Sequence, residues 1–355
     1  MKMGKDCFIK KNDRRKALIL LFSALVLLLC LSSGAEEEQE EPVPLYRAVV
    51  SSSGRILDRP DGETVQYVRK GYLVDIYSVD PKYLYVSCYN QVGYLLRDRV
   101  ETVYAVDSVS TPPYGVEIFS YLTTAGKDLP IWPAPVEEGD PLITLHEGAS
   151  FGIIGFENGW AKVIFKRQYG YVRGDWLNDL IQVRGGTDED LLDAPLSIYT
   201  SYYNLADTPA NRNRIVNLNV ACQRLENIVL DPGERLDFNK QVGPYKASVG
   251  YQSAPVLAGG TTTLNYGGGT CQVASTLYNA VLQLPGLTVT RRRAHGPSGA
   301  SYVPHGVDAA VGSGNINLIF RNDYDFPIRF EAAAQDGALT INIWKAETLS
   351  DSGEK

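Results

Sequence analysis

Apolar residues in the second half of the chain recur at three- and four-residue spacing in two segments, as they do along one buried face of a helix. The first set is Ile215, Leu218, Cys222, Leu225 and Val229. Pro232-Gly233 follows, and this pair predicts where the first helix stops. Because Cys222 lies on the apolar face, we expect a small core residue there and not a reactive group.

The second helical pattern begins within YGGGTCQVASTLYNAVLQL, residues 266–284. Its apolar face consists of Val273, Leu277, Ala280, Val281 and Leu284. Pro285-Gly286 ends it, so the pattern predicts a helix with Cys271 in its first turn.

The first half of the chain has a different pattern, in which short β-branched and aromatic runs alternate with Asp-Pro or Asn-Gly turns. The predicted strands are Leu73–Tyr77, Tyr83–Tyr89, Phe151–Phe156 and Ala161–Phe165. Short strands of this kind are typical of small β-barrels.

The same half also contains an internal duplication. Gly71 precedes the pair Gly93-Tyr94 by 22 residues, and Gly148 precedes the pair Gly170-Tyr171 by 22 residues. The repeated pattern resembles bacterial SH3-like domains, which in exported proteins often hold cell-wall peptides or glycans. Two barrels that serve only as spacers would give the same pattern, so both interpretations stay open.

The N-terminus has the pattern of an export signal. Seven Lys and Arg residues precede the apolar run 17–31, and Ser33-Gly34-Ala35 resembles a cleavage site. The apolar run is short for a transmembrane helix. Cleavage and retention as a membrane anchor through residues 17–31 are both compatible with this pattern, and either places the protein outside the cytoplasm, secreted or in the cell wall.

Composition narrows the class of partner. The formal net charge is −7, and no dense basic stretch follows the N-terminus, so nucleic acid is not an expected partner. Cys88, Cys222 and Cys271 are the cysteines after the signal segment. This odd number leaves at least one thiol unpaired within a monomer.

Cys271 has a context that favours chemistry. The free N–H groups and the positive dipole end of a helix favour thiolate over thiol, and Gly267, Gly268 and Gly269 carry no side chains that would block a substrate. The alternative is that the glycines permit tight packing and that Cys271 is an inert buried residue.

A catalytic thiol needs a base, and histidine suits that role near neutral pH. The segment Leu287–Arg292 alternates as a strand would and places His295 just beyond its end. The segment Val307–Val311 is expected to be the next strand, carrying Asp308. A helix-borne Cys followed by a His and an Asp on strands is the order of transglutaminase-like and NlpC-type cysteine enzymes. A structural turn or strand role for Asp308, and a turn role for His305, are the alternatives.

These residues also carry a family resemblance. The motifs LDPGERLDFNKQVGPYKASVGYQSAPVL, YGGGTCQVASTLYNAVL, SYVPHGVDAAV and LIFRNDYDFPIRF resemble the VanW-like domain, named from vancomycin-resistance gene clusters, from about Tyr202 to Phe330. The resemblance implies L,D-transpeptidase activity on peptidoglycan, with Cys271 as nucleophile and His295 as the histidine after the strand. Arg293 occupies a position where many relatives have a second histidine.

The expected domain order follows from the composition and the two resemblances. The boundaries are 1–35 for a signal peptide or signal anchor, 36–45 for an acidic linker, 46–105 and 115–182 for the SH3-like domains, 196–345 for an α+β VanW-like domain and 346–355 for a disordered tail.

The mechanism expected for such a domain needs no ATP. A Cys271 thiolate attacks the carbonyl of the third stem-peptide residue, expels a terminal D-alanine and holds the chain as a thioester until an amine attacks. His295 and Asp308 complete the catalytic set. The oxyanion is met by the Cys271 N–H with help from Gln272. Substrate contacts are expected at Gly267, Gly268, Gly269, Gln272 and Arg293, and no cofactor or metal is expected.

The sequence thus predicts an exported L,D-transpeptidase that cross-links peptidoglycan stem peptides. A peptidoglycan peptide hydrolase of the L,D-carboxypeptidase type and a non-enzymatic cell-wall binding protein are the alternatives.

Overall fold

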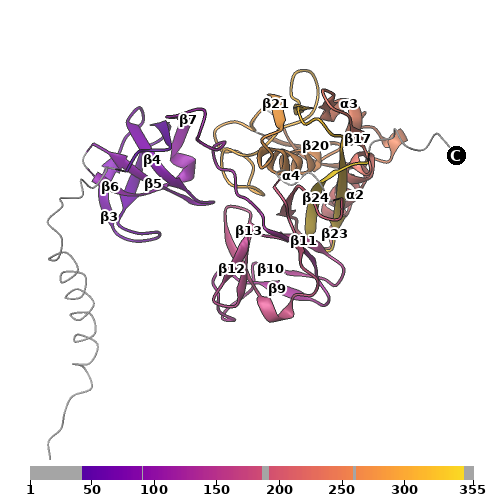
Figure 1. The fold of residues 1–355 in the computed structure, drawn as a ribbon, viewed down its shortest axis with the longest axis horizontal. Coiled ribbons are helices and arrows are strands. Elements are labelled where there is room, and N and C mark those ends of the chain that lie inside the picture. Colours follow the sequence, from indigo (N-terminus) through magenta and orange to yellow (C-terminus); the bar gives the residue numbers. More distant parts are fainter. Residues whose placement is uncertain (1–41, 90, 186–191, 259–260, 348–355) are drawn as a thin grey trace, which may run out of the picture. The chain divides into compact units, whose positions relative to one another are not determined.

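A computed structural model describes residues 42–89, 91–185, 192–258 and 261–347 (Figure 1). The chain divides into a unit of residues 1–43 and a compact unit of residues 44–355, which contains every element described below. The predicted signal segment lies outside the described residues. No helix within the described ranges is long and apolar enough to cross a membrane. The compact unit is mostly β, with several antiparallel sheets and a C-terminal α+β region.

The first β module is one antiparallel sheet of seven strands. Its strands are β1 (Tyr46–Val50), β2 (Gly54–Leu57), β3 (Thr64–Val68), β4 (Leu73–Val79), β5 (Tyr83–Cys88), β6 (Gln91–Leu96) and β7 (Val100–Ala105). The order is β3-β2-β6-β5-β4-β1-β7. Since β3 and β7 are its outer strands and no described pairing joins them, the sheet does not close into the predicted barrel.

The second β module consists of three small sheets. Its strands are β8 (Tyr121–Thr124), β9 (Leu129–Ile131), β10 (Ile143–Leu145), β11 (Ser150–Ile153), β12 (Gly155–Glu157), β13 (Trp160–Phe165), β14 (Gln168–Arg173) and β15 (Ile181–Gln182). The sheet orders are β10-β9, β11-β8-β15 and β12-β13-β14. No closed barrel is present in this described segment either.

The two modules repeat the same local structure at a constant offset of 77 residues. β13 lies 77 residues after β5, β14 lies 77 after β6, and the 3₁₀ turn Gly174–Trp176 lies 77 after the turn Arg97–Arg99. Gly71 and Gly148, which share this offset, both have positive φ, at 89° and 92°. Turns that need glycine are thus preserved in both copies.

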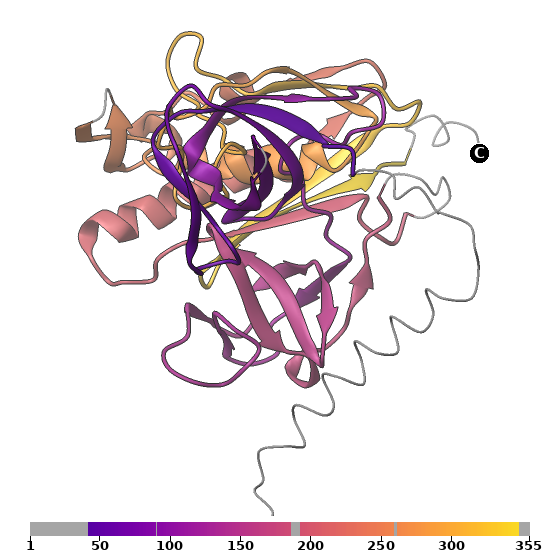
Figure 2. The same cartoon turned by 90° about the vertical axis from the view of Figure 1, so that its left-hand side faces the viewer.

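The C-terminal region combines helices with two larger sheets and a hairpin. Its elements are β16 (Ser197–Tyr202), α2 (Pro209–Leu225), β17 (Val229–Leu230), β18 (Arg235–Asp237), α3 (Phe238–Val242), the 3₁₀ turn Ala247–Val249, β19 (Ser253–Ala258), β20 (Thr261–Tyr266), α4 (Thr270–Leu282), β21 (Leu287–Arg291), β22 (Ile319–Asn322), β23 (Ile328–Gln335) and β24 (Ala338–Lys345). The sheet orders are β16-β24-β23-β17, β18-β22-β21 and β19-β20. Figure 2 shows β23 and β24 as the paired yellow strands.

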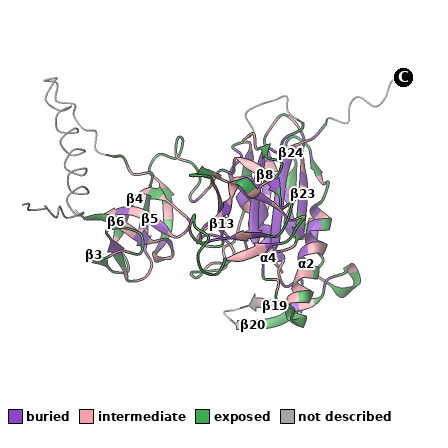
Figure 3. Ribbon diagram, turned by 90° about the horizontal axis from the view of Figure 1, so that it is seen from below, coloured by how far each residue is buried: buried purple, intermediate pink, exposed green. Residues whose placement is uncertain are grey.

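β16 is buried along its whole length because both of its faces are covered. Ser197 and Ser201 bond α4, to the carbonyl of Ala280 and the hydroxyl of Thr276. Thr200, on the opposite face, accepts the N–H of Gly152 in β11 at 2.9 Å. The second β module therefore packs on the C-terminal region through a shared strand, and buried residues dominate there (Figure 3).

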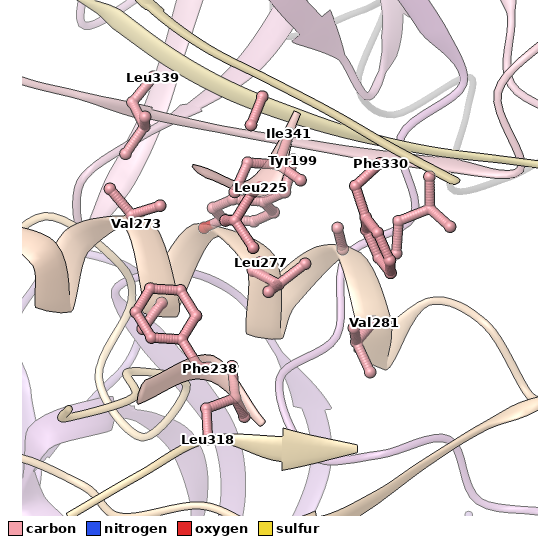
Figure 4. Packing of buried hydrophobic residues seen from close by; sticks show 14 of the residues in the cluster. Tyr199, Leu225, Phe238, Val273, Leu277, Val281, Leu318, Phe330, Leu339 and Ile341 are labelled. Atoms are coloured by element: carbon pink, nitrogen blue, oxygen red, sulfur yellow. The ribbon is translucent and has the colours of Figure 1, made fainter. Parts of the chain in front are cut away.

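Helix α4 is the centre of the largest hydrophobic core. All five apolar residues predicted for its inner face are at most 2 % exposed, which confirms that prediction. Figure 4 shows three of them, Val273, Leu277 and Val281, pointing from α4 among side chains of the sheet and of α2 and α3. The core fixes the rotation of the helix, and so the direction in which Cys271 points.

Two predicted elements differ from the structure. Helix α2 ends at Leu225 and not before Pro232, because Asn227 adopts positive φ (58°) and Val229 then pairs with Arg329 in β23. The segment Val307–Val311 was expected to be a strand, but it pairs with no strand. Its backbone instead bonds side chains of α4, as described below.

Candidate active site

The three glycines before α4 are required by the backbone. Gly267 and Gly269 have φ of 80° and 112°, a conformation that favours glycine. A Cβ on Gly268 would lie 2.7 Å from the carbonyl oxygens of Ala254 and Pro255 in β19. Gly267 and Gly268 are buried. This placement gives the glycines a packing role, and direct substrate contact at these positions stays a prediction.

Cys271 is half-buried and is the second residue of α4, so the structure confirms its position in the first helical turn. The Val311 N–H donates to its Sγ at 3.4 Å, and the thiol can donate to the Val311 carbonyl oxygen at 3.4 Å. When the thiol ionises, the N–H contact and the positive helix end remain to stabilise the thiolate.

The segment Val307–Val311 is held by a row of polar side chains on α4. Cys271, Ser275 and Asn279 follow at four-residue intervals and bond Val311, Ala309 and Val307, which follow at two-residue intervals. Ser275 accepts the Ala309 N–H at 2.8 Å, and Asn279 donates to the Val307 carbonyl at 2.8 Å. The spacings match because four helical residues rise about 6 Å and two extended residues about 6.6 Å.

Asp308 points away from this row, toward His295. Its Oδ2 accepts both the His295 Nδ1–H, at 2.6 Å, and the His295 backbone N–H, at 2.8 Å. Its Oδ1 lies 3.2 Å from Arg292 Nη2, and Arg292 also donates to the carbonyls of Asp308 and Gly306. Asp308 is 1 % exposed. Both of its carboxylate oxygens have hydrogen-bond partners, as is usual for buried polar groups.

The charges of this cluster are coupled. Burial opposes ionisation of Asp308, but its hydrogen bonds from His295 and the charge of Arg292 outweigh burial and hold the pKa of the carboxyl below its usual range. Burial likewise opposes protonation of His295, but hydrogen bonds with Asp308 and Cys271 and the charge of Cys271 raise the pKa of the imidazole to about 9. The imidazolium form of His295 is therefore favoured at neutral pH.

The structure thus brings Cys271, His295 and Asp308 together, in the roles of thiol, imidazole and orienting carboxylate that a cysteine enzyme needs. Whether they catalyse a reaction stays a prediction. Among the described residues, no cluster of three or more His, Cys, Asp or Glu could hold a metal ion.

The two other predicted substrate contacts lie differently. Gln272 is 1 % exposed, and its amide bonds Arg214, the Ser201 hydroxyl and the Tyr202 carbonyl. The amide is thus engaged in the core, and a contribution of Gln272 to the oxyanion stays a prediction. The Arg293 side chain is exposed, and its carbonyl accepts the Ala310 N–H.

Sequence reasoning missed three residues around the thiol. Arg292 entered the sequence analysis only as the last residue of the expected strand Leu287–Arg292, and nothing in the periodicity distinguished it as the partner of Asp308. Tyr302 packs edge-on against His295, with 6.3 Å between ring centroids, and burial and then the charge of Cys271 raise its pKa. Arg214 comes from α2, and only the fold brings it to α4.

The remaining cysteines and His305 have structural surroundings. Cys88 and Cys222 are free and buried, and burial raises the pKa of both thiols. His305 Nε2 bonds the Pro297 carbonyl at 2.7 Å, in keeping with the turn role considered for it.

The site is therefore a Cys–His–Asp cluster in the α+β region of a mostly antiparallel β protein. Residues 213–344 match the family model described as "VanW like protein", so this part of the chain is a VanW-like domain.

Two curated proteins are related to it. An "Uncharacterized protein YoaR" from Bacillus subtilis is 35% identical over 155 residues, which cover 44% of this chain and 49% of that protein. The "Vancomycin B-type resistance protein VanW" from Enterococcus faecalis is 33% identical over 117 residues, which cover 32% of this chain and 42% of that protein. The chain thus spans about half the length, or less, of these relatives.

Solved structures give a weaker likeness. NlpC1 from Trichomonas vaginalis has a TM-score of 0.17 at 12% identity and covers 89% of this chain and 99% of its own. An NlpC/P60 family protein from Bacillus cereus has a TM-score of 0.17 at 8% identity, covering 86% and 95%. Scores this low support no conclusion about a shared fold.

Proposed function

We propose that this protein is an exported cysteine-dependent L,D-transpeptidase that cross-links peptidoglycan stem peptides. One observation carries the proposal: the Cys271 thiol receives the Val311 N–H at a helix start and is electrostatically coupled to a His295 that Asp308 orients. A buried core residue would need no oriented imidazole with a raised pKa beside it.

The proposed reaction has two steps. The Cys271 thiolate attacks the carbonyl carbon of the third stem residue, and the His295 imidazolium gives its proton to the departing amine of the terminal D-alanine. A thioester links the stem to Sγ. The amine of a second stem then attacks this thioester, His295 takes the amine proton, and the thiolate leaves as the new peptide bond forms.

The choice of substrate rests on the relatives. The name of the Enterococcus protein associates it with vancomycin resistance, and this supports a cell-wall substrate for the shared domain. The basic residues and apolar run at the N-terminus support an extracytoplasmic location, where a cross-link must be made without ATP.

Incubation of the purified protein with defined stem tetrapeptides, with and without an acceptor amine, tests the reaction. Mass spectrometry should detect an acyl-enzyme at Cys271 and a cross-linked dimer. Formation of tripeptide without a cross-linked dimer would mean that the enzyme hydrolyses the bond and does not transfer the stem to an amine. Absence of both acyl-enzyme and products would favour a non-enzymatic wall-binding protein.

Location has its own test. Protease added to intact, wall-stripped cells should digest the protein, while a cytoplasmic marker in the same cells survives. Full protection of the protein would contradict the proposed export.

A further inference from the structure

A groove of about 450 Å³ lies beside the His295–Asp308 pair, between the first β module and the VanW-like domain. One wall is formed by Glu101 and Thr102 of β7 with Tyr114 of the following linker, and the other by Arg292, His305 and Asp308. We propose that this groove binds the free ammonium group of a peptide substrate, with Glu101 as its anionic partner. The inference rests on the proposed function in taking a peptide as the ligand.

The two walls are packed together through the linker. Gly115 is buried, and a Cβ on it would lie 1.9 Å from Arg97 Nη2 of the first module and 3.1 Å from Val307 of the VanW-like domain. Arg97 is 1 % exposed, lies over the Tyr114 ring at 4.9 Å and donates to the Asp80 carbonyl at 3.1 Å. Since Val307 directly precedes Asp308, the linker packs close to the Asp308 carboxylate as well as to the first module.

The charges on the groove walls favour a cation. Arg292 is paired with Asp308, and its Nε and Nη2 donate to the carbonyls of Asp308 and Gly306. His305 is bonded to the Pro297 carbonyl. Glu101 is exposed on β7 and takes part in none of these bonds. Among the charged side chains that line the groove, its carboxylate is thus exposed and outside these contacts, and a primary ammonium can form a charge-assisted hydrogen bond with it.

The backbone beside Glu101 departs from regular strand geometry, and this changes the direction of the side chains on this wall of the groove. Thr102 has φ of 53°, a strained conformation for a β-branched residue. The ladder to β1 shifts at the same place, because Arg47 pairs with Tyr104 whereas Val49 pairs with Glu101. A bulge of this kind redirects a side chain out of the regular strand, here at the edge of the groove.

An amine-binding groove next to the imidazole suits a peptide donor or acceptor. Stem peptides carry a primary amine on their diamino residue and can carry another at their N-terminus. A subsite for ammonium would select such peptides over amine-blocked ones. The first module would then bind substrate, in addition to any attachment to the wall.

Calorimetric binding to the full chain carrying Cys271→Ala, which prevents turnover, tests this inference. The probes are the tripeptide L-alanyl-γ-D-glutamyl-L-lysine and the same peptide with both amines acetylated. Acetylation should weaken binding about tenfold or more, the expected loss for a hydrogen bond to a charged group. Adding Glu101→Gln should weaken binding of the free-amine peptide equally and leave the acetylated peptide unchanged.

Glu147→Gln, which changes an exposed carboxylate of the second module, is the matched control and should have no effect. Equal affinity for the two peptides, or no effect of Glu101→Gln, would overturn the subsite. If binding follows the prediction but the wild-type protein forms no acyl-enzyme, the subsite stands and the proposed function fails. If acyl-enzyme forms equally well with a stem tetrapeptide whose amines are acetylated, the function stands and the subsite fails.

Discussion

The backbone N–H of Val311 donates to Sγ of Cys271 at 3.4 Å, which ties the candidate nucleophile to the segment that carries Asp308. Asp308 lies three residues before Val311. It accepts hydrogen bonds from the ring Nδ1–H and from the backbone N–H of His295. One short segment therefore contacts the thiol directly and also determines the orientation of the imidazole. The predictions below test this arrangement.

Replacing Cys271 with Ala should abolish acyl-enzyme formation and change the melting temperature little, because it removes one half-buried sulfur atom. In the wild-type protein, iodoacetamide should label Cys271 well before the buried Cys88 and Cys222. Peptide mass spectrometry measures the acylation and the labelling, and thermal melts measure the stability. Persistent acylation in the variant, or a large loss of thermal stability, would favour a core role for this cysteine.

Cys271→Ala should also lower the pKa of His295 from its value of about 9, because the hydrogen bond and the charge of Cys271 both raise it. NMR titration of the His295 ring protons measures the change, with His146 of the second module as an internal reference. An unchanged titration would mean that thiol and imidazole do not interact.

The same pKa shift has a consequence for stability. The folded-state pKa of about 9 lies above the ordinary value of about 6.5, so protonation of His295 stabilises the folded protein. This contribution is fully present below pH 6.5 and is lost as the pH rises through about 9. Thermal melts of the wild-type protein should therefore fall over this interval more steeply than melts of His295→Asn.

Ser275→Ala should destabilise the protein by about 1–3 kcal/mol, the cost of leaving a buried N–H of Ala309 without an acceptor. It should also slow acylation, because Ser275 fixes the segment between Cys271 and Asp308. Urea unfolding and single-turnover acylation measure the two effects. Thr263→Ala, at an exposed position of β20, is the control and should change neither.

Gly268→Ala should cost about 1–3 kcal/mol of stability, since its Cβ would overlap two backbone carbonyls of β19 that cannot easily move. Gly155→Ala, whose Cβ would meet nothing within 4 Å, is the matched control. Urea unfolding compares the two variants. A Gly268→Ala protein as stable as Gly155→Ala, but unable to bind peptide, would instead support substrate contact at the glycines.

Trp160→Ala should weaken sedimentation with purified cell wall, if the second module holds the wall as its resemblance to SH3-like domains implies. Trp160 lies edge-on to Trp132, lies beneath Arg173 and lines a hollow on that module. Acylation of a soluble stem peptide should stay nearly unchanged. Point substitution is preferable to deletion of the module, because deletion would uncover β16. Wall binding equal to that of the wild-type protein would reduce the module to a spacer.

Local pattern predicted some elements well. The buried face of α4 and the strand expected at Ala161–Phe165 lie within a residue or two of their predicted bounds, the strand at Trp160–Phe165. Both elements are determined by side chains that are neighbours in the sequence. The end of α2 was wrong because β17 pairs with β23, about a hundred residues later. No local pattern contains that information.

The candidate site shows the same division. The position of Cys271 at a helix start and the approximate place of His295 followed from spacing and breakers. The segment Val307–Val311 resembled a strand by composition, yet its partners are side chains of α4 and not another ladder. The commitment of Gln272 to Arg214 is equally non-local, since 58 positions separate them.

The docking of Val307–Val311 on α4 also separates the geometry of the site from the exposed part of the loop before it. Three side chains on one helix determine where Asp308 lies relative to the thiol, and Asp308 in turn holds the His295 backbone. The exposed side chains at positions 297 and 298 of that loop can therefore change without moving the nucleophile relative to its base, whereas Tyr302 and Gly306 contact His295 and Arg292 and must keep their places. Substrate preference could diversify in that loop while the chemistry beneath it stays the same.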